Sequence, residues 1–148
     1  MGSWRRSEIV GTTANGNMVM SDYGHHPNEI RPTLRAIREK YSDKKLLVVF
    51  QPHQYSRTRE LLSEFAMSFS DVSELIIPDI YFSRDKVEDV EWMTTERFVE
   101  TLQKTEDTRQ NTERKIVQNG NGLENTAKLI REYDESNPNS SIILLLGA

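Results

Sequence analysis

The sequence predicts an α/β fold: a Rossmann-like three-layer domain with a mainly parallel sheet of about six strands, opened by an antiparallel hairpin. Short, continuous apolar runs indicate strands that are covered on both faces, as in parallel sheets. Amphipathic helical patterns alternate with these runs, which is typical of right-handed crossover connections. The dipeptide Asn15-Gly16 stands between the first two strand patterns and favours a tight hairpin turn.

The predicted strands differ in the strength of their patterns. The three strongest are rich in leucine or β-branched residues and cover residues 45–51, 74–78 and 141–147. Residues 115–118 form a weaker candidate. The first two strands, 7–11 and 17–22, flank the Asn15-Gly16 turn, so we expect them to pair antiparallel.

Helices are predicted between the strands at residues 28–41, 58–69, 95–104 and 123–133. In the first, Ile30, Leu34, Ile37 and Tyr41 recur at spacings of four, three and four residues, which places them on one helix face. Two polar stretches, 79–92 and 105–113, have no such period, and we expect both to be loops. A long loop in a compact domain is usually functional or mobile, whereas the second stretch is expected to be simply solvated.

The composition excludes several classes of function. A net charge of −4 argues against a protein that binds nucleic acid without regard to sequence, because such a protein needs a basic face. No apolar run reaches the roughly 18 residues of a transmembrane helix, so no membrane is expected as a partner. The lack of cysteine excludes disulfides and thiolate metal sites. Residues 1–3 resemble an expression remnant, which leaves residues 4–148 as one expected domain.

Two polar clusters, residues 21–27 and 51–57, contain all three histidines of the chain. Each cluster lies where a predicted strand gives way to a helix. In an open α/β sheet, ligands bind at the carboxyl ends of the strands. We therefore expect the two clusters to form one site.

In the first cluster, His25 and His26 lie in the turn before Pro27, a residue favoured at the first position of a helix. Free backbone N–H groups in such a turn suit phosphate or carboxylate, and an imidazole can donate a hydrogen bond to these anions. The alternative is that one histidine only caps the helix or packs against Tyr23. Zinc fits less well, because adjacent histidines project in different directions and no carboxylate stands at a ligand spacing.

Two further residues of this cluster allow two interpretations each. Asp22 ends a predicted strand, where a carboxylate can bind the hydroxyls of a ribose, but it can also cap the local turn. Tyr23 can stack on a base or cover the edge of the sheet.

In the second cluster, Arg57 begins the following helix and offers a planar guanidinium fork to carboxylate or phosphate. Its alternative role is an ordinary surface ion pair with Glu60 or Glu64. His53 precedes this helix and is a further candidate to face a ligand. Arg59 points elsewhere around the helix, so we expect its side chain to be solvated.

Three motifs are absent from the chain: the phosphate loop G-x-x-x-x-G-K-[ST], the dinucleotide motif G-x-G-x-x-G after the first parallel strand, and the nucleophile elbow. We therefore expect neither catalytic residues nor metal ligands within this domain alone.

A resemblance to a known family lies in two stretches, SDYGHHPNEIRPTLRAIRE (21–39) and KKLLVVFQPHQYSRTRELLSEF (44–65). Both are similar to the C-terminal domain of UDP-N-acetylmuramate–L-alanine ligases, which are ATP-dependent Mur ligases of peptidoglycan synthesis. The similarity runs along nearly the whole chain. The Mur-peptide recycling ligases are the nearest alternative, but their second motif resembles QPHQYSR less.

The resemblance implies a cytoplasmic enzyme of three domains. The first binds the UDP sugar, the central one carries the phosphate loop and magnesium ligands, and the third closes over ATP. ATP phosphorylates the muramate carboxylate, and the alanine amine then displaces phosphate. The residues implied for nucleotide binding are Asp22 and Tyr23. Those implied to face the substrate and phosphates are His25, His26, His53 and Arg57. The partners implied are UDP-N-acetylmuramate, L-alanine, ATP with magnesium, and the other two domains.

Two residues depart from the family pattern. Gln54 stands where the family usually has arginine, and Ser21 stands where it usually has a second acid. The chain also stops before the glycine-rich turn and last helix into which the family continues. We expect the isolated chain to be inactive in ligation, because the phosphate loop lies elsewhere. The alternative is a free-standing, non-catalytic binding or scaffold module that retains the Mur ligase fold.

Overall fold

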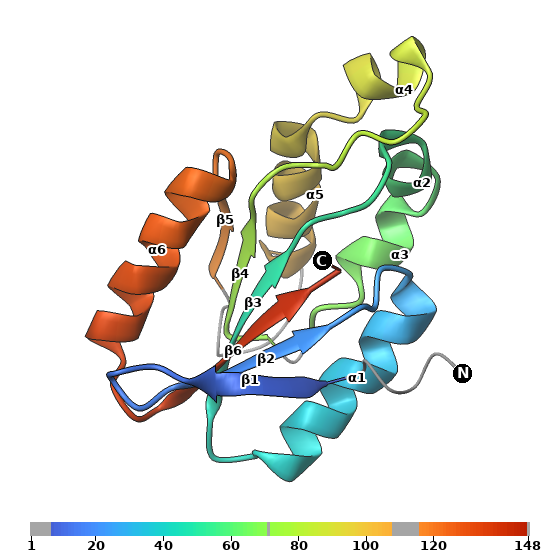
Figure 1. Ribbon diagram of the computed structural model, residues 1–148. Coiled ribbons are helices and arrows are strands. Elements are labelled where there is room, and N and C mark those ends of the chain that lie inside the picture. Colours follow the sequence, from blue (N-terminus) through green and yellow to red (C-terminus); the bar gives the residue numbers. More distant parts are fainter. Residues whose placement is uncertain (1–6, 71, 108–115, 148) are drawn as a thin grey trace.

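The computed structural model of the protein describes residues 7–70, 72–107 and 116–147. Six strands form one sheet in the order β1-β2-β6-β3-β4-β5 (Figure 1). The strands are β1 (Glu8–Thr12), β2 (Met18–Asp22), β3 (Lys45–Phe50), β4 (Glu74–Ile77), β5 (Ile116–Asn119) and β6 (Ser141–Leu146). The helices are α1 (Pro27–Lys40), α2 (Tyr55–Glu60), α3 (Leu62–Ala66), α4 (Val87–Trp92), α5 (Thr95–Asp107) and α6 (Leu123–Ser136).

The pairing of the strands confirms the predicted fold class. β1 and β2 are antiparallel, whereas the pairs β2–β6, β6–β3, β3–β4 and β4–β5 are all parallel. The hairpin turn forms where the sequence predicts it, with the Thr13 N–H donating to the Asn17 carbonyl at 2.8 Å. Gly16 takes a φ of 86°, a conformation that glycine adopts without steric cost.

The larger part of the core lies on one face of the sheet. Phe50, at the end of β3, has its ring centroid 5.4 Å from those of Phe65 and Phe69 and 6.4 Å from that of Phe98. These partners come from α3, the segment after it, and α5, while α1 adds buried residues such as Ile30. Five of the six β3 residues are buried, which explains the continuous apolar run.

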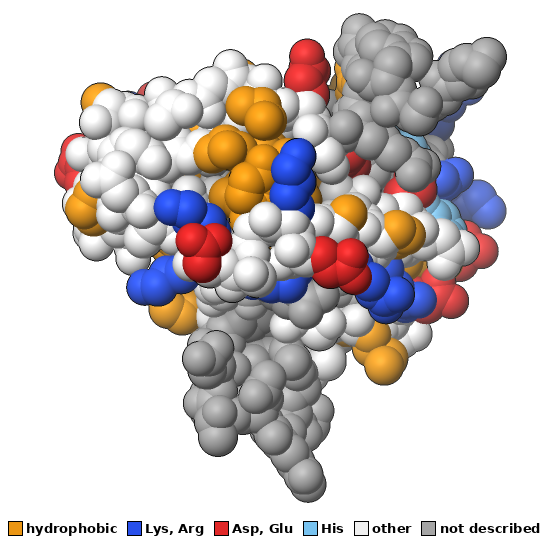
Figure 2. Space-filling model, turned by 90° about the horizontal axis from the view of Figure 1, so that it is seen from below, with side chains coloured by type: hydrophobic (Ala, Val, Ile, Leu, Met, Phe, Trp, Pro, Cys, Tyr) orange, Lys and Arg blue, Asp and Glu red, His pale blue; other side chains and the backbone are white. Residues whose placement is uncertain are grey.

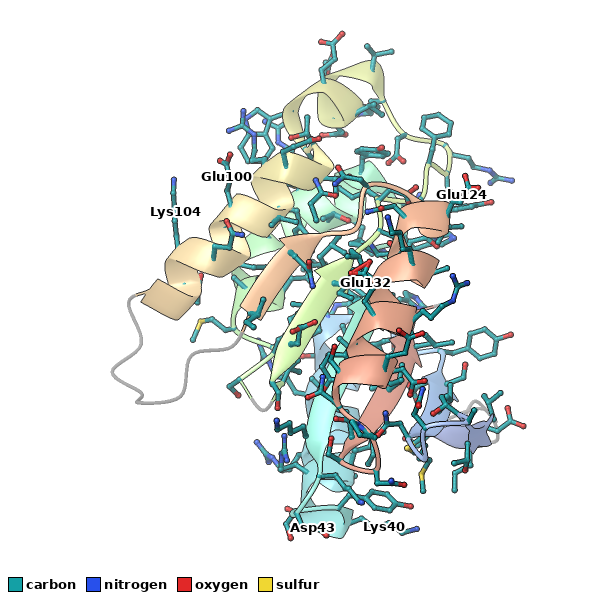
Figure 3. All side chains as sticks on the ribbon, turned by 90° about the vertical axis from the view of Figure 1, so that its left-hand side faces the viewer. Lys40, Asp43, Glu100, Lys104, Glu124 and Glu132 are labelled. Carbon is teal, nitrogen blue, oxygen red and sulfur yellow. The ribbon has the colours of Figure 1, made fainter. Side chains whose placement is uncertain are left out.

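The opposite face is covered by α6. Leu129 and Ile130 of this helix belong to a second apolar cluster with Leu47, Val49 and Ile143 of the sheet. The sheet is therefore enclosed between two layers of helix (Figure 1). Glu100 and Lys104 of α5 and Glu124 and Glu132 of α6 are exposed on the outer sides of these helices (Figure 3). Within the described ranges, no helix is long and apolar enough to cross a membrane.

The β1 edge of the sheet is solvent-exposed. All five residues of β1 are exposed, and Ile9 and Val10 retain 55% and 62% of their accessible surface. Figure 2 views the molecule from the side of β1 and α1, and shows apolar side chains gathered in a patch beside basic ones. A bulge between Ile9 and Gly11 interrupts the register of this edge, a feature that discourages pairing with another strand.

Three predictions about helices and loops are wrong in part. The helix predicted over 58–69 consists of two short helices, α2 and α3, which meet at Leu61. The predicted loop 79–92 contains α4, which has no apolar stripe and buries none of its residues, so hydrophobic periodicity could not reveal it. The predicted loop 105–113 is helical up to Asp107, and its remainder lies outside the described residues.

A buried polar network holds the hairpin turn against the end of α6. The Asp134 carboxylate accepts hydrogen bonds from the Thr13 hydroxyl at 2.6 Å, the Asn15 amide at 2.7 Å and the Asn17 amide at 2.8 Å. Asn17 is fully buried, and its side-chain oxygen accepts the Ser141 N–H at 2.9 Å, which attaches the turn to the start of β6. Burial by itself raises the pKa of Asp134, but the three hydrogen bonds outweigh it and lower that pKa overall.

We expect the Asp134→Asn substitution to destabilise the fold in a pH-dependent way. Because folding lowers its pKa, the carboxylate stabilises the protein above the ordinary value of about 4, and this contribution is lost as the pH falls through the lowered value. Urea unfolding at neutral pH should show a loss of about 1–3 kcal/mol, and a smaller loss in acid. The control is Glu135→Gln, at the exposed residue next to Asp134. This substitution should change the free energy of unfolding little. Equal losses in both variants would contradict the network's role.

Candidate functional site

The two predicted clusters meet at the carboxyl edge of the sheet, as the sequence predicts, and a third segment joins them. The segment after β3 continues to pair with the segment after β4, in parallel, through a bridge between His53 and Tyr81. The Gln54 N–H donates to the Tyr81 carbonyl at 2.8 Å, and the Tyr81 N–H donates to the Pro52 carbonyl at 2.8 Å. This pairing brings residues 79–86, here called the β4 loop, to the site.

A pocket of about 420 Å³ lies between these segments, lined by His25, His53, Gln54, Arg57, Ser83 and Arg84. It brings together three of the residues predicted to face phosphate or substrate, one from the first cluster and two from the second. The His25 and His53 rings are 6.4 Å apart between centroids, and His53 stacks on Tyr81 at 4.8 Å. Figure 2 shows the histidines at the rim of the molecule, next to both basic and acidic side chains.

The turn before α1 does not offer free N–H groups, so that part of the prediction is wrong. His26 caps the helix, with its Nδ1 accepting the Asn28 N–H at 3.0 Å. The Glu29 carboxylate in return accepts the N–H groups of His25 and His26 at 3.3 and 3.2 Å. The capping alternative is thus confirmed for His26, which is not among the residues lining the pocket. An anion at this turn would have to displace Glu29.

Asp22 is almost fully buried at 1% exposure. Its two carboxylate oxygens accept the Ser7 N–H at 2.7 Å and the Gly24 N–H at 2.8 Å. The second of these bonds is the local turn cap that the sequence left open as an alternative. Tyr23, beside it, is 46% exposed. Contacts of these two residues with a nucleotide stay a prediction.

Arg57 is exposed as the third residue of α2. In the part of the chain that the structure describes, no ion pair joins it to Glu60 or Glu64, so that alternative is not realised there. The helix start that carries it is anchored by Thr58, whose buried hydroxyl donates to the Gln54 carbonyl at 2.7 Å.

Arg59 is not simply solvated, contrary to expectation. It forms an ion pair with Asp89 of α4 at 3.2 Å. Its guanidinium also lies 4.5 Å from the centroid of the Trp92 ring, and Arg97 of α5 lies 4.7 Å from the same ring. Arg59 therefore links α2 to α4, outside the pocket.

Sequence reasoning missed Asp85, which organises this site. Its carboxylate accepts the Ser56 N–H at 2.8 Å, in the first turn of α2, and the Ser83 N–H at 3.1 Å in its own loop. Burial raises the pKa of Asp85, but hydrogen bonds from the backbone at Ser56, Tyr55 and Ser83 outweigh it and lower the pKa. The partner in α2 lies 29 residues away, so no local pattern could reveal this cap.

The charges around the pocket favour an anionic ligand. Two guanidinium groups and two imidazoles line it, and no carboxylate does. The nearby carboxylates of Glu29 and Asp85 already accept backbone N–H groups. Such a donor set fits phosphate or carboxylate and does not fit a hard cation such as Mg²⁺ or Ca²⁺, which needs oxygen ligands. Within the described ranges, no three His, Asp or Glu side chains come close enough to hold a metal.

Comparisons with known proteins agree with the motifs. The family model described as "Mur ligase, glutamate ligase domain" matches residues 5–148. The UDP-N-acetylmuramate–L-alanine ligase of Endomicrobium trichonymphae is 44% identical over 98 residues, which are 66% of this chain and 21% of that protein. The chain therefore spans about a fifth of the length of this relative.

Solved structures share the fold. The murein peptide ligase of Psychrobacter arcticus superposes with a TM-score of 0.69 at 16% identity, covering 97% of this chain and 26% of that one. The UDP-N-acetylmuramate–alanine ligase MurC of Thermotoga maritima gives 0.59 at 20% identity, with the same two coverages. With the family match over residues 5–148, these findings confirm the resemblance: the chain belongs to the Mur ligase family and has the fold of its C-terminal domain.

Proposed function

We propose that this chain is the closing domain of a UDP-N-acetylmuramate–L-alanine ligase and contributes anion contacts to ATP and to the muramate substrate. The observation that carries the proposal is the cationic pocket, in which His25, His53 and Arg57 come together from both sequence motifs. The Endomicrobium relative, which bears that enzyme's name, supports the choice of substrate class. The longer protein is expected to act in the cytoplasm.

In this proposal each pocket residue has a distinct task. Arg57 presents its planar fork to phosphate or carboxylate oxygens, and no described ion pair competes for it. His25 and His53 donate ring N–H groups to the same oxygens. His26 fixes the turn that carries His25, since it caps α1. ATP, when bound, supplies the phosphoryl group that activates the muramate carboxylate.

The nucleotide base and ribose are expected near Asp22 and Tyr23. The exposed Tyr23 ring can lie against a base, whereas Asp22 must first give up one of its two backbone hydrogen bonds to reach a ribose hydroxyl. Magnesium is expected on another domain, because the pocket offers cations rather than carboxylates. The chain alone is therefore expected to lack ligase activity.

Calorimetry of the isolated chain with ATP or ADP should give weak binding, with a dissociation constant no tighter than about 100 μM. The reason is that the pocket supplies only part of the phosphate contacts, and its exposed charges are screened by solvent and salt. A submicromolar dissociation constant would contradict the proposed division of the site between domains.

In the full-length ligase, Arg57→Ala should lower turnover by about 100-fold or more, because the lost guanidinium stabilises charge that develops on the reacting phosphates. The free energy of unfolding should change by less than about 0.5 kcal/mol, since Arg57 is exposed. Steady-state kinetics and urea unfolding measure the two effects separately.

The matched control is Arg35→Ala, which removes the same charge from the exposed side of α1. It should leave turnover unchanged. If Arg57→Ala behaves like this control, Arg57 has no part in the reaction.

A further inference from the structure

A cluster of four side chains attaches α4 to the helices before and after it. The Cζ atoms of Arg59 in α2 and Arg97 in α5 lie 4.5 and 4.7 Å from the centroid of the Trp92 ring. Asp89 completes the cluster with its 3.2 Å ion pair to Arg59. These residues, here called the Trp92 cluster, are not among those that line the pocket.

The attachment of α4 to the domain depends on this cluster. None of the α4 residues is fully buried, and Trp92 is the α4 residue that packs against the core. Met93, which follows it, is fully buried and fixes the end of the helix. A helix with so few buried apolar contacts opens locally at a lower free-energy cost than the core. The Trp92 side chain therefore decides how firmly α4 is held.

The contacts of the ring are favourable ones. A guanidinium group over an aromatic ring is attracted by the negative face of the ring, and tryptophan is the best aromatic partner. Two cations near one ring also repel each other, and the Asp89 carboxylate offsets the charge of Arg59. The Asp89 side chain is only 19% exposed, so salt screens this ion pair less than it screens a fully exposed one. One side chain, Trp92, thus couples α2, α4 and α5.

The same cluster sets the orientation of α2. A helix turns about 100° per residue, so the side chains of Arg57 and Arg59 leave α2 in nearly opposite directions. Asp89 and Trp92 hold Arg59 on the side of α2 that faces α4. Arg57 is therefore on the other side of the helix, where it lines the pocket. Because α2 has six residues and fully buries only Thr58, its own packing opposes rotation weakly.

We propose that Trp92 is a positioning residue, which acts through Arg59 to hold α2 in the orientation that directs Arg57 into the pocket. Arg97 supports the ring from α5. The inference rests on the proposed function, since it assumes that Arg57 contacts the ligand. It does not depend on which ligand the pocket binds.

Hydrogen–deuterium exchange of the chain tests the attachment. Trp92→Leu keeps an apolar side chain but removes the ring, so amides of residues 55–61 and 87–92 should exchange about tenfold faster, and those of β3 and β6 should stay within twofold of the wild type. Trp92→Phe keeps an aromatic face and should stay within about threefold. Unchanged exchange in Trp92→Leu would overturn the role of the ring.

A second variant tests the same contact from α2, at an exposed position where folding is not at risk. Arg59→Gln removes both the ion pair and the contact with the ring, so it should speed exchange in the same two segments. The charge-matched control Arg35→Gln should change exchange in neither segment by more than twofold. If Arg59→Gln behaves like this control, Trp92 does not act through Arg59.

Turnover of the full-length ligase separates positioning from a general loss of stability. Trp92→Leu should lower kcat about tenfold in the wild-type background. It should lower kcat by less than twofold in a background that already carries Arg57→Ala, because the cluster acts through Arg57. Trp92→Phe should recover most of the lost kcat. An equal loss in both backgrounds would overturn the proposal.

The outcomes distinguish this inference from the proposed function. If Arg57→Ala lowers turnover but Trp92→Leu leaves it within twofold, the proposed function stands and the positioning role of Trp92 is overturned. If Arg57→Ala itself leaves turnover unchanged, the proposed function is overturned, and the exchange data alone decide whether Trp92 holds α2 and α4 in place.

Discussion

The site depends on one backbone pairing: the continuation of β3 and β4 beyond their ends, through the hydrogen bonds between residues 52–54 and Tyr81. Without this pairing, the β4 loop would have no fixed position relative to α2. With it, Gln54 reaches Ser83 and Asp85 reaches Ser56, so the two segments become one wall of the pocket. The positive charge of the site then comes from side chains, because carboxylates of the chain itself occupy the starts of α1 and α2.

The two ends of the sheet serve different purposes. At the amino end of β6, buried Asn17 and Asp134 satisfy each other and the surrounding backbone, which stabilises the fold. At the carboxyl ends of β3 and β4, the exposed side chains of Arg57 and Arg84 have no ion-pair partner within the described ranges. Unbalanced charge of one sign costs stability in a free chain, and it is expected where a ligand supplies the opposite charge.

Much of the fold follows from local pattern. The apolar runs of β3 and β6, the Asn15-Gly16 turn and the stripe on α1 each specify their element without help from distant residues. Periodicity fails at α4, which has no fully buried residue and packs against the core only through the partly buried Trp92, and at Leu61, where α2 ends and α3 begins. These features depend on tertiary contacts such as the Arg59–Asp89 ion pair, which spans 30 residues.

The site, like the fold, has parts that local sequence predicts and parts that depend on tertiary contacts. The histidine motifs locate the site, because strand ends and helix starts can be recognised in the sequence. Glu29 at the third helical position also indicates the capping box that occupies the turn before α1. The contributions of Ser83, Arg84 and Asp85 come from a loop without periodicity, and only the β3–β4 pairing brings them to the pocket. A polar loop after a central strand therefore merits inspection as part of a site.

Hydrogen–deuterium exchange of the full-length ligase, with and without nucleotide and muramate substrate, tests the central claim that three separate segments form one ligand-binding wall. Peptides covering 23–26, 53–57 and 81–85 are expected to gain protection together on binding, whereas β1 and the hairpin turn do not change. Protection confined to the β1 side of the sheet, or absent from the β4 loop, would contradict this claim.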